Sequence, residues 1–172
     1  VIKAEKAHGR FNYRLADPAD LSKPFVVEAG KYYTITFDYL VNSTSTGNIG
    51  FDPYYGLKDS GNAADGTAGR KAVADFVCSG FSKKFIGDGK WHTAAVSFLA
   101  NPTEIKVEEE VVETLNNIYM TFFDDKGIDG YFKNFTIVEE TDATGLYVDR
   151  YTTDMKAHIG QSGTTYGSAM TY

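Results

Sequence analysis

The sequence predicts an all-β fold in which two antiparallel sheets pack into a β-sandwich. The chain holds 12 Tyr and 12 Phe together with 17 Gly, a composition that favours strands separated by many turns. Apolar and polar residues alternate over 31–40 with the period of a half-buried strand. Short apolar runs recur between turn-forming residues, as in sandwich domains. The length of 172 residues suits one domain.

The first half of the chain is organised around the strand expected at 31–40. Ala29-Gly30 provides the turn before it, and a Ser/Thr/Gly-rich turn over 42–48 follows it. Residues 56–69 have almost nothing to bury, so we expect a long exposed loop, either functional or a mobile connection. Further strands are expected at 11–15, 49–54 and 70–79. The central strand carries Tyr33, Ile35, Phe37 and Tyr39 on one face and Tyr32, Thr34, Thr36 and Asp38 on the other.

The second half opens with a predicted hairpin, in which residues 87–90 (Gly-Asp-Gly-Lys) join strands at 81–86 and 91–99. Trp91 is one residue out of phase with the core-facing residues of its strand. Either a bulge turns Trp91 inward or it points out at the rim. Because a Trp buries a large apolar area, we favour the core position. The charged stretch 105–112 forms a strand or a short helix.

Two further strands joined by an acidic turn are expected over 116–140. Asp124, Asp125 and Asp129 lie in this turn with two glycines. The last strand is expected to place Tyr131, Lys133, Phe135 and Ile137 on one face, and Phe132, Asn134, Thr136 and Val138 on the other. We therefore divide the chain into a sandwich domain over 1–140 and a C-terminal extension over 141–172, which holds a final strand, a linker or both.

Charge and cysteine content exclude several classes of partner and of stabilisation. The formal charge is −6, the pI is about 5.0, and no basic cluster occurs, which argues against nucleic acid or an anionic membrane. Cys78 is the only cysteine, so no intrachain disulfide forms, and we expect this residue in the core. No apolar run reaches the length of a membrane span. With neither a starting Met nor a signal peptide, we expect an excised domain or a processed chain.

Three stretches carry a resemblance to a known superfamily. They are PFVVEAGKYYTITFDYLV over 24–41, the Gly-Lys-Trp-x-x-Ala-x-Val-x-Phe pattern over 89–98, and the strand pair over 116–140. Together they resemble the carbohydrate-binding-module-like β-sandwich superfamily found in modular bacterial glycan-binding and glycan-degrading proteins. The resemblance covers roughly 25–138 in patches. It implies a jelly roll that binds a polysaccharide or oligosaccharide as a monomeric part of a larger secreted or cell-surface protein.

Sugar binding needs flat aromatic faces with polar groups at their edges, which Tyr and Trp supply. The cluster of Asp52, Tyr54 and Tyr55 lies at the mouth of the long loop, and adjacent tyrosines on a strand point to opposite sides. Tyr32 and Tyr119 line one concave sheet face in this hypothesis, together with Thr34, Thr36 and Asp38. The favoured alternative is that both tyrosines pack under loops or between the sheets. The expected sugar-binding residues are Tyr54, Tyr55, Asp52, Tyr32, Tyr119, Trp91, Asn48 and Arg70.

The acidic turn raises the question of a metal. Calcium binds several oxygen ligands, and modules of the superfamily often carry a structural calcium, for which Asp124, Asp125 and Asp129 are the candidates. Their spacing does not match an EF-hand loop, and a solvated turn is the favoured interpretation. No cofactor is required for the expected function.

Catalysis has little support in the sequence. The carboxylates at 108–110 and 113 lie in a charged run that is typical of a solvent-exposed face, not of a catalytic pair. The three histidines do not have the spacing of metal ligands. We therefore expect no enzyme. A structural or protein-binding sandwich of an adhesin or scaffold is the alternative, and a small sandwich-fold glycosidase or lyase is a weaker one. Fold alone decides between none of these, and the glycan, its linkage and the mode of binding stay open.

Overall fold

The computed structural model describes residues 1–4, 10–42, 50–56, 62–80, 85–123 and 128–140. Within these residues the chain forms strands and turns without a helix, which confirms the all-β prediction. The described part accordingly contains no helix long and apolar enough to span a membrane. The extension expected at 141–172 lies outside it.

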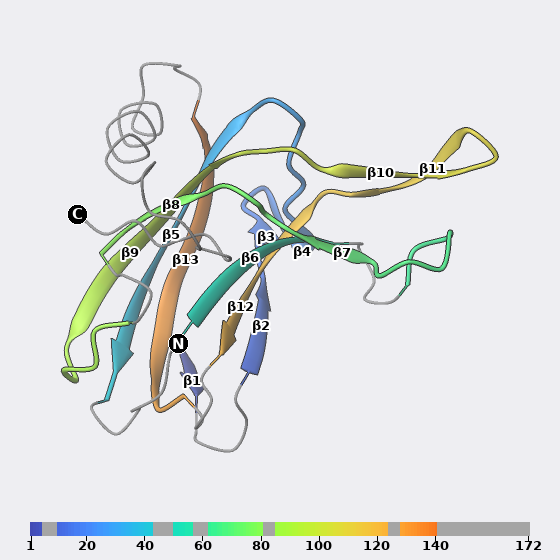
Figure 1. The fold of residues 1–172 in the computed structure, drawn as a ribbon. Helices are drawn as coiled ribbons and strands as arrows, with labels where there is room; N and C mark the ends of the chain where they lie inside the picture. The colour runs from blue at the N-terminus through green and yellow to red at the C-terminus, as the bar shows by residue number, and fades with distance from the viewer. Residues whose placement is uncertain (5–9, 43–49, 57–61, 81–84, 124–127, 141–172) are drawn as a thin grey trace, which may run out of the picture.

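The largest sheet has five antiparallel strands in the order β1-β13-β5-β9-β8 (Figure 1). Its centre is β5, which pairs with β13 on one side and with β9 on the other. β-branched and aromatic residues dominate β5, as suits a pleated surface with close cross-strand neighbours. The strands of this sheet are β1 (Ile2–Ala4), β13 (Gly130–Glu140), β5 (Tyr32–Val41), β9 (Trp91–Leu99) and β8 (Val77–Ser79).

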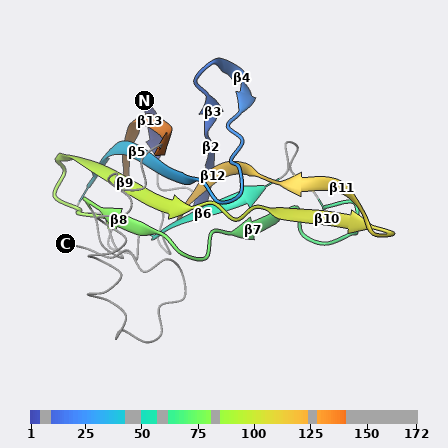
Figure 2. The ribbon, with the colours of Figure 1, turned by 90° about the horizontal axis from the view of Figure 1, so that it is seen from above.

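A second sheet has four antiparallel strands in the order β2-β12-β6-β7. Two hairpins complete the structure, and the β10–β11 hairpin projects away from both larger sheets (Figures 1 and 2). The described strands thus form four sheets, not the two that were predicted. The remaining strands are β2 (Arg10–Arg14), β12 (Asn117–Phe123), β6 (Gly50–Gly56), β7 (Arg70–Ala72), β3 (Ala16–Asp17), β4 (Asp20–Pro24), β10 (Thr103–Val107) and β11 (Glu110–Leu115).

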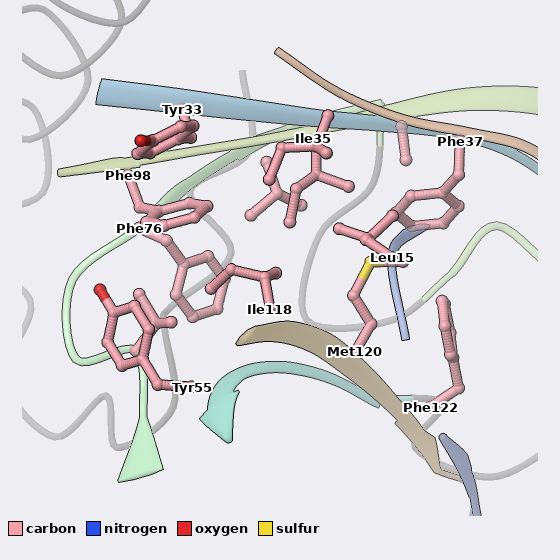
Figure 3. Packing of buried hydrophobic residues seen from close by; sticks show 14 of the residues in the cluster. Leu15, Tyr33, Ile35, Phe37, Tyr55, Phe76, Phe98, Ile118, Met120 and Phe122 are labelled. Atoms are coloured by element: carbon pink, nitrogen blue, oxygen red, sulfur yellow. The ribbon is translucent and has the colours of Figure 1, made fainter. Parts of the chain in front are cut away.

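The core lies between the two larger sheets, where buried side chains of β5 and β12 face one another (Figure 3). Phe37 of β5 and Phe122 of β12 meet edge to face, with ring centroids 5.5 Å apart. Cys78 is buried in the same cluster, as expected. The two sheets therefore enclose one core in a sandwich-like arrangement, while the jelly-roll connectivity remains a prediction. The residues that β5 and β12 contribute include Tyr33, Ile35, Phe37, Ile118, Met120 and Phe122.

Several expected elements differ from the structure. Residues 70–79 are not one strand, because β7 joins the four-stranded sheet and β8 joins the five-stranded sheet. The described partners of β9 are β5 and β8. Of the strand expected at 81–86, residues 85 and 86 are not in a strand and residues 81–84 lie outside the described part, so the predicted hairpin remains a prediction. The stretch 105–112 forms strand on both arms of the β10–β11 hairpin, whose turn holds Glu108 and Glu109 at positive φ.

The strand after the acidic turn contains a bulge that the alternation rule did not anticipate. Lys133 pairs with Asp38 and Thr136 pairs with Thr36, which leaves two residues of β13 opposite one residue of β5. Asn134 lies in this bulge and has a φ of 55°, a conformation that Asn tolerates better than most residues. The predicted faces of 131–138 are therefore wrong beyond this point, because Phe132 and Phe135 both pack against the core.

Candidate functional site

The expected sugar-binding residues that the structure describes lie on two different sheets. Tyr54, Tyr119 and Arg70 lie together on the four-stranded sheet, whereas Trp91 and Tyr32 belong to strands of the five-stranded sheet. The hypothesis that Tyr32 and Tyr119 share one face is wrong, since their strands belong to different sheets on either side of the core. The favoured alternative is confirmed, because Tyr119 is buried and stacked on Tyr54, and Tyr32 packs against the core cluster.

The other expected residues give a mixed outcome. Tyr55 is buried and Tyr54 is partly exposed, which agrees with the prediction that at most one of the two adjacent tyrosines is buried. Asp52 lies on β6 in register with Thr121. Asn48 lies outside the described residues.

The tyrosine pair on the four-stranded sheet is tightly packed. Tyr54 and Tyr119 are in register on β6 and β12, and their rings stack with centroids 5.5 Å apart and planes 13° apart. The guanidinium of Arg70 lies 5.4 Å from the centroid of the Tyr54 ring. Gly56 makes room for this packing, because a Cβ there would lie 2.8 Å from Cε1 of Tyr119. The two rings therefore cover each other's facing sides, and the Arg70 guanidinium lies over the Tyr54 ring.

The hydroxyl of Tyr119 shows how closed this cluster is. Burial raises the pKa of Tyr119, and a hydrogen bond from Arg70 together with the nearby charges of Arg70 and Arg14 partly offsets that rise. Only 9% of Tyr119 is exposed. Tyr119 therefore supports the sheet and presents no open ring to a ligand.

An open aromatic ring is found instead at the start of β9. Ala94, Val96 and Phe98 are fully buried and face the core, and Trp91 has the opposite parity on the same uninterrupted strand. The indole therefore projects from the outer face, with 43% of the residue exposed. The favoured core position for Trp91 is wrong, because no bulge in β9 corrects its phase.

A polar network on the same outer face surrounds the carboxylate of Asp38. Its Oδ1 accepts a hydrogen bond from Oγ1 of Thr93 at 2.7 Å, and its Oδ2 accepts one from Nδ2 of Asn134 at 2.7 Å. The bond from Thr93, followed by that from Asn134 and the charge of Lys133, outweighs burial and lowers the pKa of Asp38. The carboxylate is therefore ionised at neutral pH, and each oxygen keeps a further acceptor position for a ligand.

Lys133 links this network to the indole. Its Nζ lies 3.9 Å from the centroid of the Trp91 ring, in the geometry of a cation–π contact. The bulge at Asn134 turns both Lys133 and Asn134 to the outer face, where they meet Trp91 and Asp38. We call Trp91, Asp38, Thr93, Lys133 and Asn134 the Trp91 surface.

Sequence reasoning missed Thr93, Lys133 and Asn134 as members of this surface. A signal was present in the spacing of the aromatic residues, since Phe132 and Phe135 are three positions apart. Strict alternation cannot place both on the core face, whereas one bulge between them can. Asn134 lies between them and tolerates positive φ, so its position is the one at which a bulge could have been predicted.

Comparison with known proteins identifies no relative of this chain. No family model matches this chain, and no curated protein or solved structure shows significant similarity to it. Its function must therefore be inferred from the side chains of the described residues.

The acidic turn gives no metal site in the part of the chain that the structure covers. Asp124 and Asp125 fall outside the described residues, and Oδ1 of Asp129 accepts a hydrogen bond from Nδ2 of Asn42 at 3.2 Å. Among the described residues, no group of three or more His, Cys, Asp or Glu side chains is arranged to hold a metal ion. A structural calcium at this turn remains a prediction.

Proposed function

We propose that this domain binds carbohydrate without catalysis, through the Trp91 surface. The observation that carries the proposal is a half-exposed indole beside an ionised carboxylate whose position is fixed by two hydrogen bonds. The apolar C–H face of a pyranose ring stacks on an indole, and its hydroxyls require nearby donors and acceptors. Asp38 supplies the acceptor, while Asn134 and Lys133 supply donors.

The polar network also lowers the cost of binding. Thr93 and Asn134 hold Asp38 in one orientation before a ligand arrives, so less side-chain freedom is lost on binding. Lys133 occupies one side of the indole and has a flexible stem, so a sugar either stacks on the remaining area or displaces the ammonium. An open surface of this kind gives modest affinity, since little of the ligand is removed from water.

The resemblance of the sequence supports a proposal for the setting of the domain. We propose that it works as a monomeric module of a larger secreted or cell-surface protein, where a weak module gains strength from its neighbours through avidity. The jelly-roll connectivity and a structural calcium belong to the same proposal.

The β10–β11 hairpin favours a second candidate function, which is protein binding. It projects from the sandwich, and Val107, Val111 and Val112 are exposed on it (Figure 2). Exposed apolar side chains on a projecting element are a feature of protein interaction sites. A structural or adhesive sandwich would use this hairpin and leave the Trp91 surface unoccupied.

Affinity electrophoresis tests the proposal directly. The domain is run through gels that contain starch, xylan, β-glucan, mannan or pectin, with and without chelator. We expect retardation in at least one gel, a loss of about tenfold or more in affinity for Trp91→Ala, and no loss for Val138→Ala. Val138 is a matched control because it is 51% exposed on the same sheet.

Three outcomes have distinct meanings. Release of reducing sugar from the retarding polymer would contradict the non-catalytic part of the proposal and favour a glycosidase. Retardation that is unchanged in Trp91→Ala would place the site elsewhere. Absence of retardation in every gel would favour the protein-binding candidate.

A further inference from the structure

A cavity lies at the other end of β9 from the Trp91 surface. Leu99 closes β9 and lines this cavity, whereas Trp91 opens the strand, so the two sites are about 26 Å apart at roughly 3.3 Å per residue. Its volume is about 360 Å³, near the lower end of the range for small-molecule sites. It is lined by Tyr55, Lys71, Asp75, Leu99, Ala100 and Asn101, together with the neighbouring β7–β8 connection.

A buried phenol forms one side of the cavity. Tyr55 is only 2% exposed, and its hydroxyl oxygen accepts a hydrogen bond from the backbone N–H of Asn101 at 2.9 Å. Burial raises the pKa of Tyr55, with a further contribution from the charge of Asp75, so the hydroxyl keeps its proton at neutral pH. No acceptor for that proton is found among the described residues. Figure 3 shows the hydroxyl at the edge of the core cluster.

The remaining lining combines polar and apolar groups. The lining includes two exposed residues of opposite charge, Asp75 and Lys71, so its formal charge is balanced. Leu99 and Ala100 add apolar wall. A carboxylate that accepts, a phenol that donates and an apolar wall together match a ring with both hydroxyl groups and C–H faces.

We propose that this cavity binds the terminal residue of a glycan, as a single uncharged pyranose. This inference rests on the proposed carbohydrate-binding function and adds chain-end recognition to it. The small volume admits one ring more readily than a continuous chain, and the balanced charges give no preference for an acidic or a basic sugar. The Trp91 surface would then contact the same or another chain at an internal position.

Methyl-resolved NMR of the whole chain tests this site with the methyl glycosides of glucose, galactose, mannose and xylose. We expect at least one of them to shift the methyl signals of Val73 and Leu99, which line the cavity, in a saturable manner. Asp75→Ala should weaken that binding about tenfold or more, because a hydrogen bond to a charged group is lost. Glu104→Ala, an exposed carboxylate on β10, is the matched control and should leave the affinity unchanged.

Two further variants separate this inference from the proposed function. Trp91→Ala should leave the methyl shifts unchanged even where it abolishes retardation by a polymer. Tyr55→Phe removes only the hydroxyl and should weaken glycoside binding, with the fold checked from the remaining methyl spectrum. The proposal is overturned if none of the four glycosides shifts these methyl signals, or if Asp75→Ala binds as tightly as the unaltered chain.

Discussion

Replacement of Phe122 by Ala should destabilise the domain strongly, because this ring joins the two sheets. Phe122 is 0% exposed and its centroid lies 5.5 Å from Phe37, 4.7 Å from Phe132 and 6.1 Å from Phe85. Burial of roughly 200 Å² at about 25 cal/mol per Å² gives about 5 kcal/mol, and measured Phe→Ala losses run about 3–5 kcal/mol. We therefore expect a loss of about 4 kcal/mol in the free energy of unfolding.

Urea unfolding followed by tryptophan fluorescence measures this loss, provided that the transition is two-state. Val138→Ala, at an exposed position of β13, should change the free energy by less than about 0.5 kcal/mol. A double-mutant cycle between Phe37→Leu and Phe122→Leu should give a coupling of about 0.5–1.5 kcal/mol across the sheets. A loss below about 1.5 kcal/mol for Phe122→Ala, or no coupling, would refute the shared core.

Three further predictions concern other parts of the fold. The pKa of Asp38 is lowered in the folded state, so its contribution to stability is present above about pH 4 and lost as the pH falls through the folded value. In urea unfolding at successive pH values, Asp38→Asn should therefore lose less stability on acidification than the unaltered chain; equal losses would contradict this. Cys78 is fully buried and should react with a thiol reagent only after urea unfolding, whereas rapid reaction in the native state would place it elsewhere. Replacing Glu108-Glu109 by Asn-Gly should raise the unfolding temperature and add about 1 kcal/mol, because both positions have positive φ in a tight hairpin turn.

Local alternation was sufficient to predict the elements that lie deepest in the fold. The expected strand at 91–99 coincides with β9, and that at 31–40 differs from β5 by one residue at each end. In both strands the apolar residues at every second position are buried on one side. The hydrophobic pattern therefore predicts both that the segment is a strand and which of its residues face the core.

The remainder depends on pairing between distant segments, which a single sequence does not display. Tyr119 and Tyr32 look equivalent in their strands, yet β12 and β5 belong to different sheets. Arg70 and Cys78 lie in one expected strand, and the chain crosses from one sheet to the other between them. The Trp91 surface depends on the bulge at Asn134, which becomes visible only when β13 is placed against β5.

Fluorescence of Trp91 tests the central claim most directly, because the chain contains a single tryptophan. The domain is titrated with the polymer that retards it in a gel, and emission and acrylamide quenching are recorded at each addition. If the sugar stacks on the indole, the emission changes saturably and quenching decreases, with the same midpoint as retardation. Retardation without any change in the emission or quenching of Trp91 would contradict binding at this surface.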